Sequence, residues 1–318
     1  MPIKKLLLAK PRGFCAGVER AIDVVDGALR LYGSPVYVRK EIVHNKYVIR
    51  SLAAKGAIFV DELDEIPDGA VTIFSAHGVS PAVRAMAVAK GLKVIDATCP
   101  LVTKVHMEAL RYASEGRSII LVGHAGHDEV IGTMGEVPGR IQLVGSAQEA
   151  ENVQVPAGEE VAVTTQTTLG VDDASQIIDV LRRRFPKLIT PPADDICYAT
   201  QNRQTAVKLL AREADLILVL GSGNSSNSRR LREVAEDGGA KAYLIDDAHE
   251  IDPAWIEGVE CVAITAGASA PEVLVQEVVE YFRKLGVEHI EEVMAIDEKV
   301  TFLLPLELSR EMNARGLT

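Results

Sequence analysis

The chain has 318 residues, of which 47% are hydrophobic and 4% aromatic, a composition typical of a globular α/β protein with enough chain for a sizeable core. Its formal net charge of −11 argues against a nucleic-acid or anionic-membrane partner, because both require a basic face. No apolar run approaches the roughly 18 residues that span a membrane. The N-terminal "MPIKKLLLAK" predicts a buried strand rather than a signal peptide, so we expect a cytoplasmic protein.

Three cysteines lie where a predicted strand turns into a predicted amphipathic helix. Cys15 follows "KLLLA", Cys99 follows "KVIDAT" and Cys197 follows "ADDI". Their spacings, about 84 and 98 residues, predict three α/β domains with pseudo-threefold packing, which would bring three thiols to one centre. A single parallel sheet with many crossovers is the alternative. The predicted domains are residues 1–97, 98–194 and 195–283, followed by a C-terminal extension, 284–318.

Each third also carries two polar clusters, most of them directly after a short apolar strand. Sites in parallel α/β sheets lie at these strand ends, and several clusters precede a helix start that can bind an anion. We expect Ser80 to cap a helix beginning at Pro81, and Ser269 to form a capping box with Glu272. The clusters are His44-Asn45 and His77, then His127-Asp128-Glu129 and Thr167-Thr168, then Ser225-Ser226-Asn227 and Ser269.

Three thiolates without a fourth protein ligand suit either zinc with an open position or a 4Fe–4S cluster with one free iron. The all-thiolate donor set favours iron–sulfur. The fourth cysteine, Cys261, lies inside the predicted strand "ECVAIT" and is interpreted as a small buried hydrophobe. Glu129 is either a proton donor beside His127 or an exposed first-turn glutamate. We expect His249 and His289 on the surface and His124 in a supporting role.

Nine motifs in order resemble the 4-hydroxy-3-methylbut-2-enyl diphosphate reductase family over about residues 5–305. One departure is Asp128, where many relatives carry proline. The motifs are "PRGFCAGVERA", "EIVHN", "FSAHGVS", "DATCPLVTKVH", "GHAGHDEV", "TQTTLGVDD", "DDICYATQNRQ", "GSGNSSNSRRL" and "TAGASAP".

The resemblance implies three α/β domains around a 4Fe–4S cluster held by Cys15, Cys99 and Cys197. It implies that Glu129 delivers protons to the substrate. It also implies an electron donor, a reduced ferredoxin or flavodoxin, since the sequence carries no flavin or nicotinamide motif. The substrate-binding residues that it implies are His44, His77, His127, Thr167, Thr168, Thr200, Ser225, Ser226, Asn227 and Ser269.

The activity implied by the resemblance is reductive dehydroxylation of an allylic diphosphate, the last step of the methylerythritol phosphate route to isoprenoids. The products are isopentenyl and dimethylallyl diphosphate, and we expect the enzyme to be a monomer. Three other readings of the residues stay open: a redox-neutral iron–sulfur hydro-lyase acting on a phosphorylated metabolite, a non-enzymatic iron–sulfur sensor, and a zinc hydrolase of phosphorylated metabolites.

Overall fold

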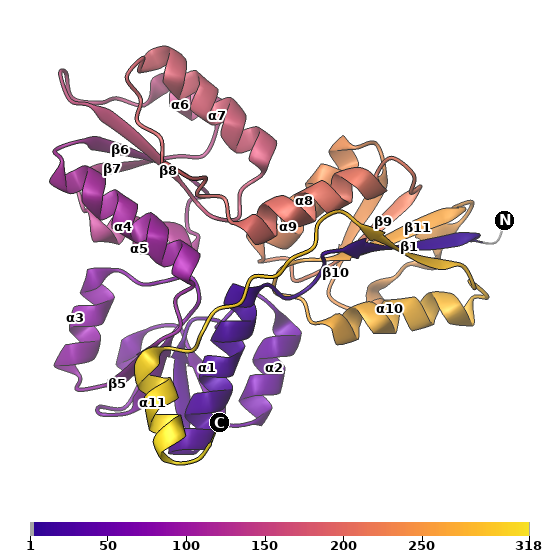
Figure 1. Ribbon diagram of the computed structural model, residues 1–318, viewed down its shortest axis with the longest axis horizontal. Coiled ribbons are helices and arrows are strands. Elements are labelled where there is room, and N and C mark those ends of the chain that lie inside the picture. The colour runs from indigo at the N-terminus through magenta and orange to yellow at the C-terminus, as the bar shows by residue number, and fades with distance from the viewer. Residues whose placement is uncertain (1–2, 318) are drawn as a thin grey trace. The chain divides into compact units, whose positions relative to one another are not determined.

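The computed structural model describes residues 3–317, and this part of the chain contains three sheets (Figure 1). Every strand pairing within them is parallel, which confirms the predicted α/β class. The chain divides into two compact units, whereas the domain boundaries at residues 97, 194 and 283 stay a prediction. Unit 1 comprises the chain up to Val18, His44–Val48 and Tyr198–Thr301; unit 2 comprises Glu19–Val43, Ile49–Cys197 and the chain from Phe302.

Unit 1 is built on a five-stranded sheet that contains the first strand of the chain. The strands, in spatial order, are β10 (Lys241–Ile245), β9 (Leu216–Leu220), β11 (Cys261–Ala266), β1 (Lys5–Lys10) and β12 (Ile290–Met294). Its helices are α8 (Tyr198–Leu210), α9 (Ser226–Asp237) and α10 (Glu272–Lys284), with short 3-10 turns η2 (Ala248–Glu250) and η3 (Pro253–Ile256).

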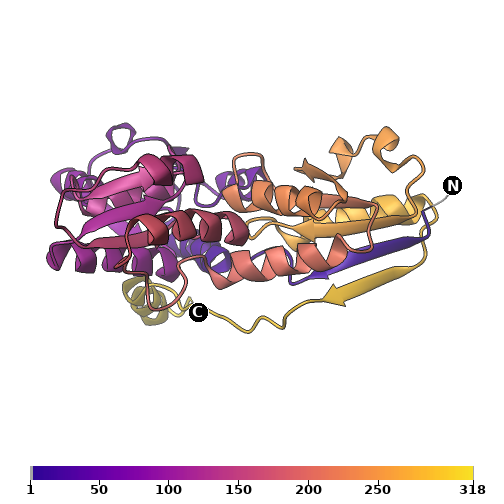
Figure 2. The same cartoon turned by 90° about the horizontal axis from the view of Figure 1, so that it is seen from above.

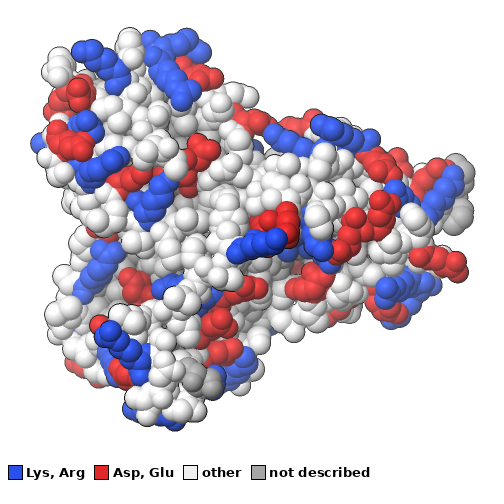
Figure 3. All heavy atoms as spheres, in the orientation of Figure 1, with Lys and Arg blue, Asp and Glu red and all other residues white. Residues whose placement is uncertain are grey.

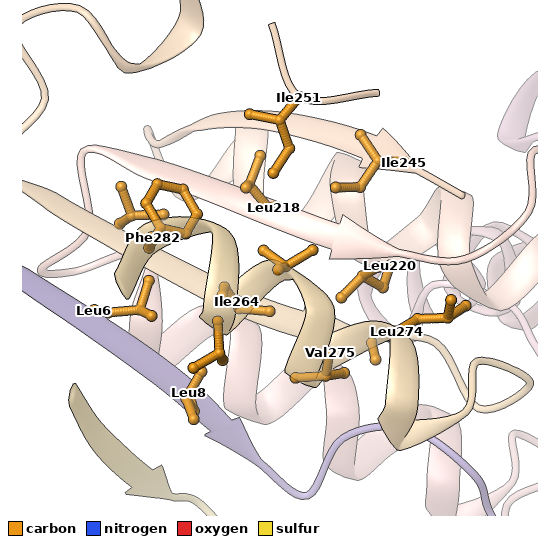
Figure 4. Packing of buried hydrophobic residues seen from close by; sticks show 14 of the residues in the cluster. Leu6, Leu8, Leu218, Leu220, Ile245, Ile251, Ile264, Leu274, Val275 and Phe282 are labelled. Atoms are coloured by element: carbon orange, nitrogen blue, oxygen red, sulfur yellow. The ribbon is translucent and has the colours of Figure 1, made fainter. Parts of the chain in front are cut away.

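The predicted buried first strand is confirmed, and its side chains alternate between two cores. Leu6 and Leu8 pack with α10 residues such as Phe282 on one face of the sheet (Figure 4). Leu7 and Ala9 pack with α8 and α9 on the other face. This two-sided burial explains why the four central residues of β1 are all apolar. β12 runs beside β1, as Figure 2 shows, although the two strands come from opposite ends of the chain.

Unit 2 contains the other two sheets. One has the order β3 (Ala57–Val60), β2 (Val36–Arg39), β4 (Val71–Phe74), β5 (Lys93–Asp96), and the other the order β7 (Ile141–Val144), β6 (Ser118–Val122), β8 (Val161–Thr165). The remaining helices are α1 (Ala16–Tyr32), α2 (Lys46–Ala54), α3 (Pro81–Ala89), α4 (Pro100–Ser114), α5 (Asp128–Glu136), α6 (Ala147–Asn152), α7 (Val171–Arg184), α11 (Leu306–Ala314) and the 3-10 turn η1 (Leu63–Glu65). Of these, α1 and α2 begin in unit 1 and continue into unit 2.

Two predicted helix starts have different outcomes. Ser80 caps α3 as expected, because its side chain accepts a hydrogen bond from the N–H of Val83 and Pro81 follows it. The capping box predicted at Ser269 is wrong: α10 begins only at Glu272, and its N-cap position, Pro271, makes no side-chain capping bond.

Within unit 2, α5 packs closely against the loop that leads from β4 into α3. A Cβ at Gly135 would lie 2.3 Å from Cβ of Ser80, so this approach requires a glycine. A buried group joins the same helices: Glu136 of α5 accepts hydrogen bonds from Arg84 of α3 and from Nδ1 of His106 of α4. Burial lowers the pKa of His106, so the neutral imidazole makes this bond.

Charged side chains of both signs are interspersed on the face drawn in Figure 3. Among residues 3–317, no helix combines the length and the apolar character needed to cross a membrane.

The contact between α5 and Ser80 predicts the effect of a small substitution. Gly135→Ala should lower the free energy of unfolding by about 1 to 3 kcal/mol through overpacking, although alanine favours a helix over glycine by about 1 kcal/mol. Urea unfolding measures the change. Ser80→Gly removes the colliding atoms, so the double variant should recover most of the loss. A double variant as unstable as Gly135→Ala would contradict this packing.

Candidate functional site

The loop that carries Cys15 is fixed to the loop after β11 within unit 1. The N–H of Gly13 donates to the carbonyl oxygen of Ala266 at 3.1 Å, and the N–H of Cys15 donates to that of Ala268 at 3.2 Å. Gly13 has φ +68°, and a Cβ there would lie 3.1 Å from the carbonyl oxygen of Ala270. A glycine is therefore needed for this close turn.

The thiol of Cys15 lies at the start of α1. Burial raises its pKa, whereas the positive charge of Arg203 and hydrogen bonds from the backbone at Val18 and Gly17 lower it. These N–H groups belong to the first turn of α1, whose positive end favours a thiolate.

The serine-rich loop of unit 1 is built around the start of α9. Ser225 is the N-cap, and its hydroxyl oxygen accepts from the N–H of Ser228 at 3.3 Å. Cβ atoms at Gly221 and Gly267 would lie 2.1 and 2.0 Å from Oγ of Ser228. The glycines after β9 and β11 thus let this helix start dock against both strand ends.

Asn227, in the first turn of α9, is the most unusual polar side chain in this loop. It is 4% exposed, and neither its Oδ1 nor its Nδ2 has a hydrogen-bond partner within residues 3–317. Leaving a buried amide unpaired costs about 1 to 3 kcal/mol. An unpaired buried amide beside a helix N-terminus is suited to a polar ligand.

His44 and Ser269 are brought together in unit 1. The hydroxyl group of Ser269 donates to the carbonyl oxygen of His44 at 2.9 Å, which replaces the predicted capping box. The imidazole Nδ1 of His44 lies 3.5 Å from the amide nitrogen of Asn224, in the serine-rich loop. Two further predicted site residues of unit 1, Ser226 on α9 and Thr200 on α8, are both buried.

The histidines of unit 2 also meet. The rings of His77 and His127 are nearly perpendicular, with centroids 5.8 Å apart. Nδ1 of His77 lies 3.2 Å from the hydroxyl group of Ser75. His127 is the N-cap of α5, where its Nδ1 accepts from the N–H of Glu129 at 3.2 Å. Both imidazoles thus have one ring nitrogen committed to a local contact that orients the ring.

Glu129 is buried, not an exposed first-turn glutamate. It is 2% exposed, and its carboxyl oxygens accept from the N–H of Thr167 at 2.6 Å and from the Thr167 hydroxyl group at 2.8 Å. The carbonyl oxygen of Thr167 in turn accepts from the N–H of Cys197 at 3.0 Å. Residues from three separate stretches of the sequence therefore form one hydrogen-bonded chain.

Burial raises the pKa of Glu129 to about 7, although the two hydrogen bonds from Thr167 act in the opposite direction. At neutral pH this carboxyl group is therefore protonated in a large fraction of molecules. A group with this pKa can both give and take a proton near physiological pH.

Gln166 and Thr168 flank Thr167 in the loop after β8 and bond to each other. The Gln166 amide donates to the hydroxyl oxygen of Thr168 at 2.9 Å, and its Oε1 accepts from the N–H of His124 at 3.0 Å. The backbone of His124 thus holds Gln166, whereas the supporting role expected for this histidine stays a prediction. Gln166 was not among the predicted site residues, although its place in "TQTTLG", directly before Thr167 and Thr168, was a signal.

The four cysteines form no disulfide within the described chain. Cys99 is the N-cap of α4, and Cys197 directly precedes α8, so each of the three predicted ligands begins a helix. Cys261 instead begins β11 and is partly exposed while it packs against the core, which makes it less buried than expected. The surface positions predicted for His249 and His289 are confirmed, with side chains 93% and 63% exposed.

The donor set agrees with an iron–sulfur ligand role. Cys15, Cys99 and Cys197 each stand at the start of a helix and form no disulfide within residues 3–317. A donor set made of thiolates alone favours iron–sulfur over zinc. The predicted site residues divide between the units as follows: unit 1 holds Cys15, His44, Thr200, Ser225, Ser226, Asn227 and Ser269, and unit 2 holds His77, Cys99, His127, Glu129, Thr167, Thr168 and Cys197.

Parallel sheets with polar loops at helix starts and a buried carboxyl group of raised pKa define an α/β enzyme. A family model described as "LytB protein" matches residues 6–283, and the chain belongs to this family. The chain is 59% identical over 317 residues to a 4-hydroxy-3-methylbut-2-enyl diphosphate reductase of Acidothermus cellulolyticus, with 99% of this chain and 93% of that protein covered. It is 58% identical over 308 residues to the Bordetella pertussis protein of the same name, covering 97% and 95%.

Solved structures agree with the sequence relatives. The structure of the E-1-hydroxy-2-methyl-but-2-enyl-4-diphosphate reductase from Plasmodium falciparum matches with a TM-score of 0.95 and 38% identity, covering 99% of this chain and all of that chain. The resemblance stated from the nine motifs is confirmed, and the chain is an oxidoreductase.

The raised pKa of Glu129 predicts how stability depends on pH. The folded chain holds a proton up to about pH 7 that the unfolded chain loses near pH 4.5, so this stabilisation is present below pH 4.5 and lost as the pH rises through 7. Glu129→Gln removes the titration. Relative to the native chain, the variant should gain on the order of 2 to 3 kcal/mol between pH 5 and pH 8.5.

Thermal unfolding of both proteins across this pH range measures the gain. The comparison uses only the change with pH, so any constant effect of the amide group cancels. A pH-independent difference between the two proteins would show that the carboxyl group is ionised throughout and would contradict its raised pKa.

Proposed function

We propose that the chain catalyses the reductive dehydroxylation of 4-hydroxy-3-methylbut-2-enyl diphosphate to isopentenyl and dimethylallyl diphosphate. The substrate gains two electrons and two protons, the carbon–oxygen bond breaks, and the oxygen leaves as water. The names of the relatives support this reaction. The observation that carries it is the buried Glu129, whose pKa near 7 suits a group that protonates a leaving oxygen.

In this proposal Cys15, Cys99 and Cys197 hold a 4Fe–4S cluster. When bound, such a cluster would supply Lewis-acid and one-electron redox chemistry. The thiol chemistry and the helix-start positions of these cysteines support the assignment. A protein electron donor, a ferredoxin or flavodoxin, would supply the electrons.

The chain's own residues have two tasks in this reaction. Glu129 holds a proton at its carboxyl oxygen, and the Thr167 hydroxyl group, 2.8 Å away, orients that oxygen. His44, His77, His127, Ser225, Ser226, Asn227 and Ser269 bind the diphosphate, with Thr168 and Thr200 as further substrate contacts. Diphosphate binding by remote groups orients the reacting carbon, which lowers the barrier without touching the bond that breaks.

Cysteine variants test the cluster. Anaerobically reconstituted protein should bind iron and sulfide and turn over only with a reduced donor, whereas Cys99→Ser and Cys197→Ser should lose most of the iron. Cys261→Ser is the matched control and should keep the iron content and the absorbance spectrum. A colourless protein with near-stoichiometric zinc would contradict the cluster, and turnover without a reductant would favour the hydro-lyase.

Steady-state kinetics of two further variants test the division of tasks. Glu129→Gln should lower kcat by a factor of about 10² to 10⁴ with little change in KM, because it removes a proton donor. Asn227→Leu should raise KM roughly tenfold with a smaller effect on kcat, since a lost hydrogen bond costs about 1 to 3 kcal/mol. Iron content should be unchanged in both. Equal effects on kcat and KM in the two variants would contradict separate roles.

A further inference from the structure

Each of the three predicted cysteine ligands is followed by a cation at nearly the same place on its helix. Each cation hydrogen-bonds to the segment just before a different cysteine. The cation on the helix after Cys15 binds the segment before Cys99, and the cation on the helix after Cys99 binds the segment before Cys197. The cation on the helix after Cys197 binds the segment before Cys15, which completes a cyclic order. The cations are Arg20 on α1 and Lys104 on α4, each five residues after its cysteine, and Arg203 on α8, six residues after its cysteine.

Arg20 binds the turn before Cys99. Its Nη1 donates to the carbonyl oxygens of Ala97 and Thr98, at 3.1 and 3.0 Å, and its Nε donates to the carbonyl oxygen of Leu303 at 2.8 Å. Ala97 and Thr98 are the two residues that directly precede Cys99. Arg20 also interacts electrostatically with Cys99, so its charge lies close to this ligand.

Arg203 binds the turn before Cys15 in the same way. It is fully buried, and its guanidinium group donates to the carbonyl oxygens of Gly13, at 2.7 and 3.1 Å, and Phe14, at 3.2 Å. These are again the two residues that precede the cysteine. Nη1 donates to the carboxylate of Glu298 at 3.0 Å, which adds a charge-assisted hydrogen bond that holds the guanidinium group in place.

Lys104 binds the segment before Cys197. Its Nζ donates to the carbonyl oxygens of Ala193 and Asp194, at 2.9 and 3.0 Å, and lies 3.3 Å from the buried carboxylate of Asp195. The other oxygen of Asp195 accepts from Thr164 and Thr165 at the end of β8. The third cation thus fixes its cysteine segment partly through a carboxylate.

We propose that Arg20, Lys104 and Arg203 are positioning residues that fix the three cysteine turns, and that Arg20 and Arg203 also place a permanent positive charge beside Cys99 and Cys15. The proposal rests on the proposed 4Fe–4S cluster for its electrostatic part only. The cyclic pattern means that each turn depends on the helix of another cysteine, so that loss of one cation loosens one ligand turn and leaves the other two.

The charge has a definite electrostatic consequence. Reduction makes the cluster more negative, and a fixed positive charge nearby stabilises the reduced form. Removal of the charge should therefore make reduction harder. Lysine in place of arginine keeps the charge but loses the two-pronged hydrogen bonding, so that the charge and the positioning can be tested separately.

The first experiment measures the reduction potential, by redox titration, and the rate of iron release to a chelator in the reconstituted full chain. Arg20→Gln and Arg203→Gln should each lower the reduced-to-oxidised ratio at a fixed potential about tenfold, which corresponds to about 59 mV for one electron. In Arg20→Lys and Arg203→Lys the reduction potential should change by less than a third of that shift. Both variants should release iron to a chelator several times faster than the native chain.

The matched control is Arg283→Gln, which removes an arginine from the end of α10 whose side chain is 56% exposed. It should change neither the potential nor the rate of iron release. The proposal is overturned if the Arg20 and Arg203 variants behave like this control in both measurements.

Hydrogen exchange tests the positioning without any cluster. The N–H groups of Cys15, Cys99 and Cys197 are all hydrogen-bonded, so loosening of a turn raises their exchange rates. We expect roughly tenfold faster exchange around Cys15 in Arg203→Lys, around Cys99 in Arg20→Lys and around Cys197 in Lys104→Gln, with the other two turns unchanged. Exchange in β9 reports on folding.

The two proposals fail in distinguishable ways. A native chain that binds no iron refutes the proposed cluster, whereas the exchange experiment still decides the positioning role. Native-like exchange in all three variants, or uniform acceleration throughout β9 as well, would refute the positioning role whatever the iron content.

Discussion

Parallel strand pairing is the constraint on which every group of site residues depends. In a parallel sheet all strands end at the same edge, and each is followed by a loop that leads into a helix. Ser225 and His127 are N-caps of such helices, and Cys99 is a third. The chemistry-bearing residues therefore lie where free backbone N–H groups and the positive ends of helices are available, because the topology offers no other common edge.

This arrangement explains how an acidic chain can be suited to an anionic substrate. The net charge of −11 is a sum over the whole chain, and charges beyond about 8 to 10 Å are screened in physiological salt. Helix N-termini, histidines and buried amides act at hydrogen-bond distance, where screening is weak. Local dipoles therefore outweigh the overall charge at a binding loop. A net negative charge disfavours the binding of extended polyanions more strongly than the binding of small anions.

Local features were predictable from the sequence, and long-range partners were not. The cap at Ser80 and the strand "KLLLA" follow from patterns within a few residues. Ser269 has the local signature of a capping box, but its hydroxyl group donates to His44, 225 residues away, and that tertiary contact overrides the local one. The hydrogen bonds of Arg20 and Arg203 to the cysteine turns could be predicted from the sequence only in part. The spacing of a cation after each cysteine was visible, but not the carbonyl groups it binds.

Glu129 links the energetics of the fold to its chemistry. Burying its carboxyl group destabilises the ionised form, and the hydrogen bonds from Thr167 offset only part of that cost, which leaves the pKa near 7. The same Thr167 holds the N–H of Cys197, and the segment before Cys197 is tied to the end of β8 through Asp195 and Lys104. Thr167 therefore links the buried carboxyl group of Glu129 to the turn of Cys197 through direct hydrogen bonds. In such a connected network the protonation of Glu129 and the geometry of Cys197 are energetically coupled, so neither residue can be optimised alone.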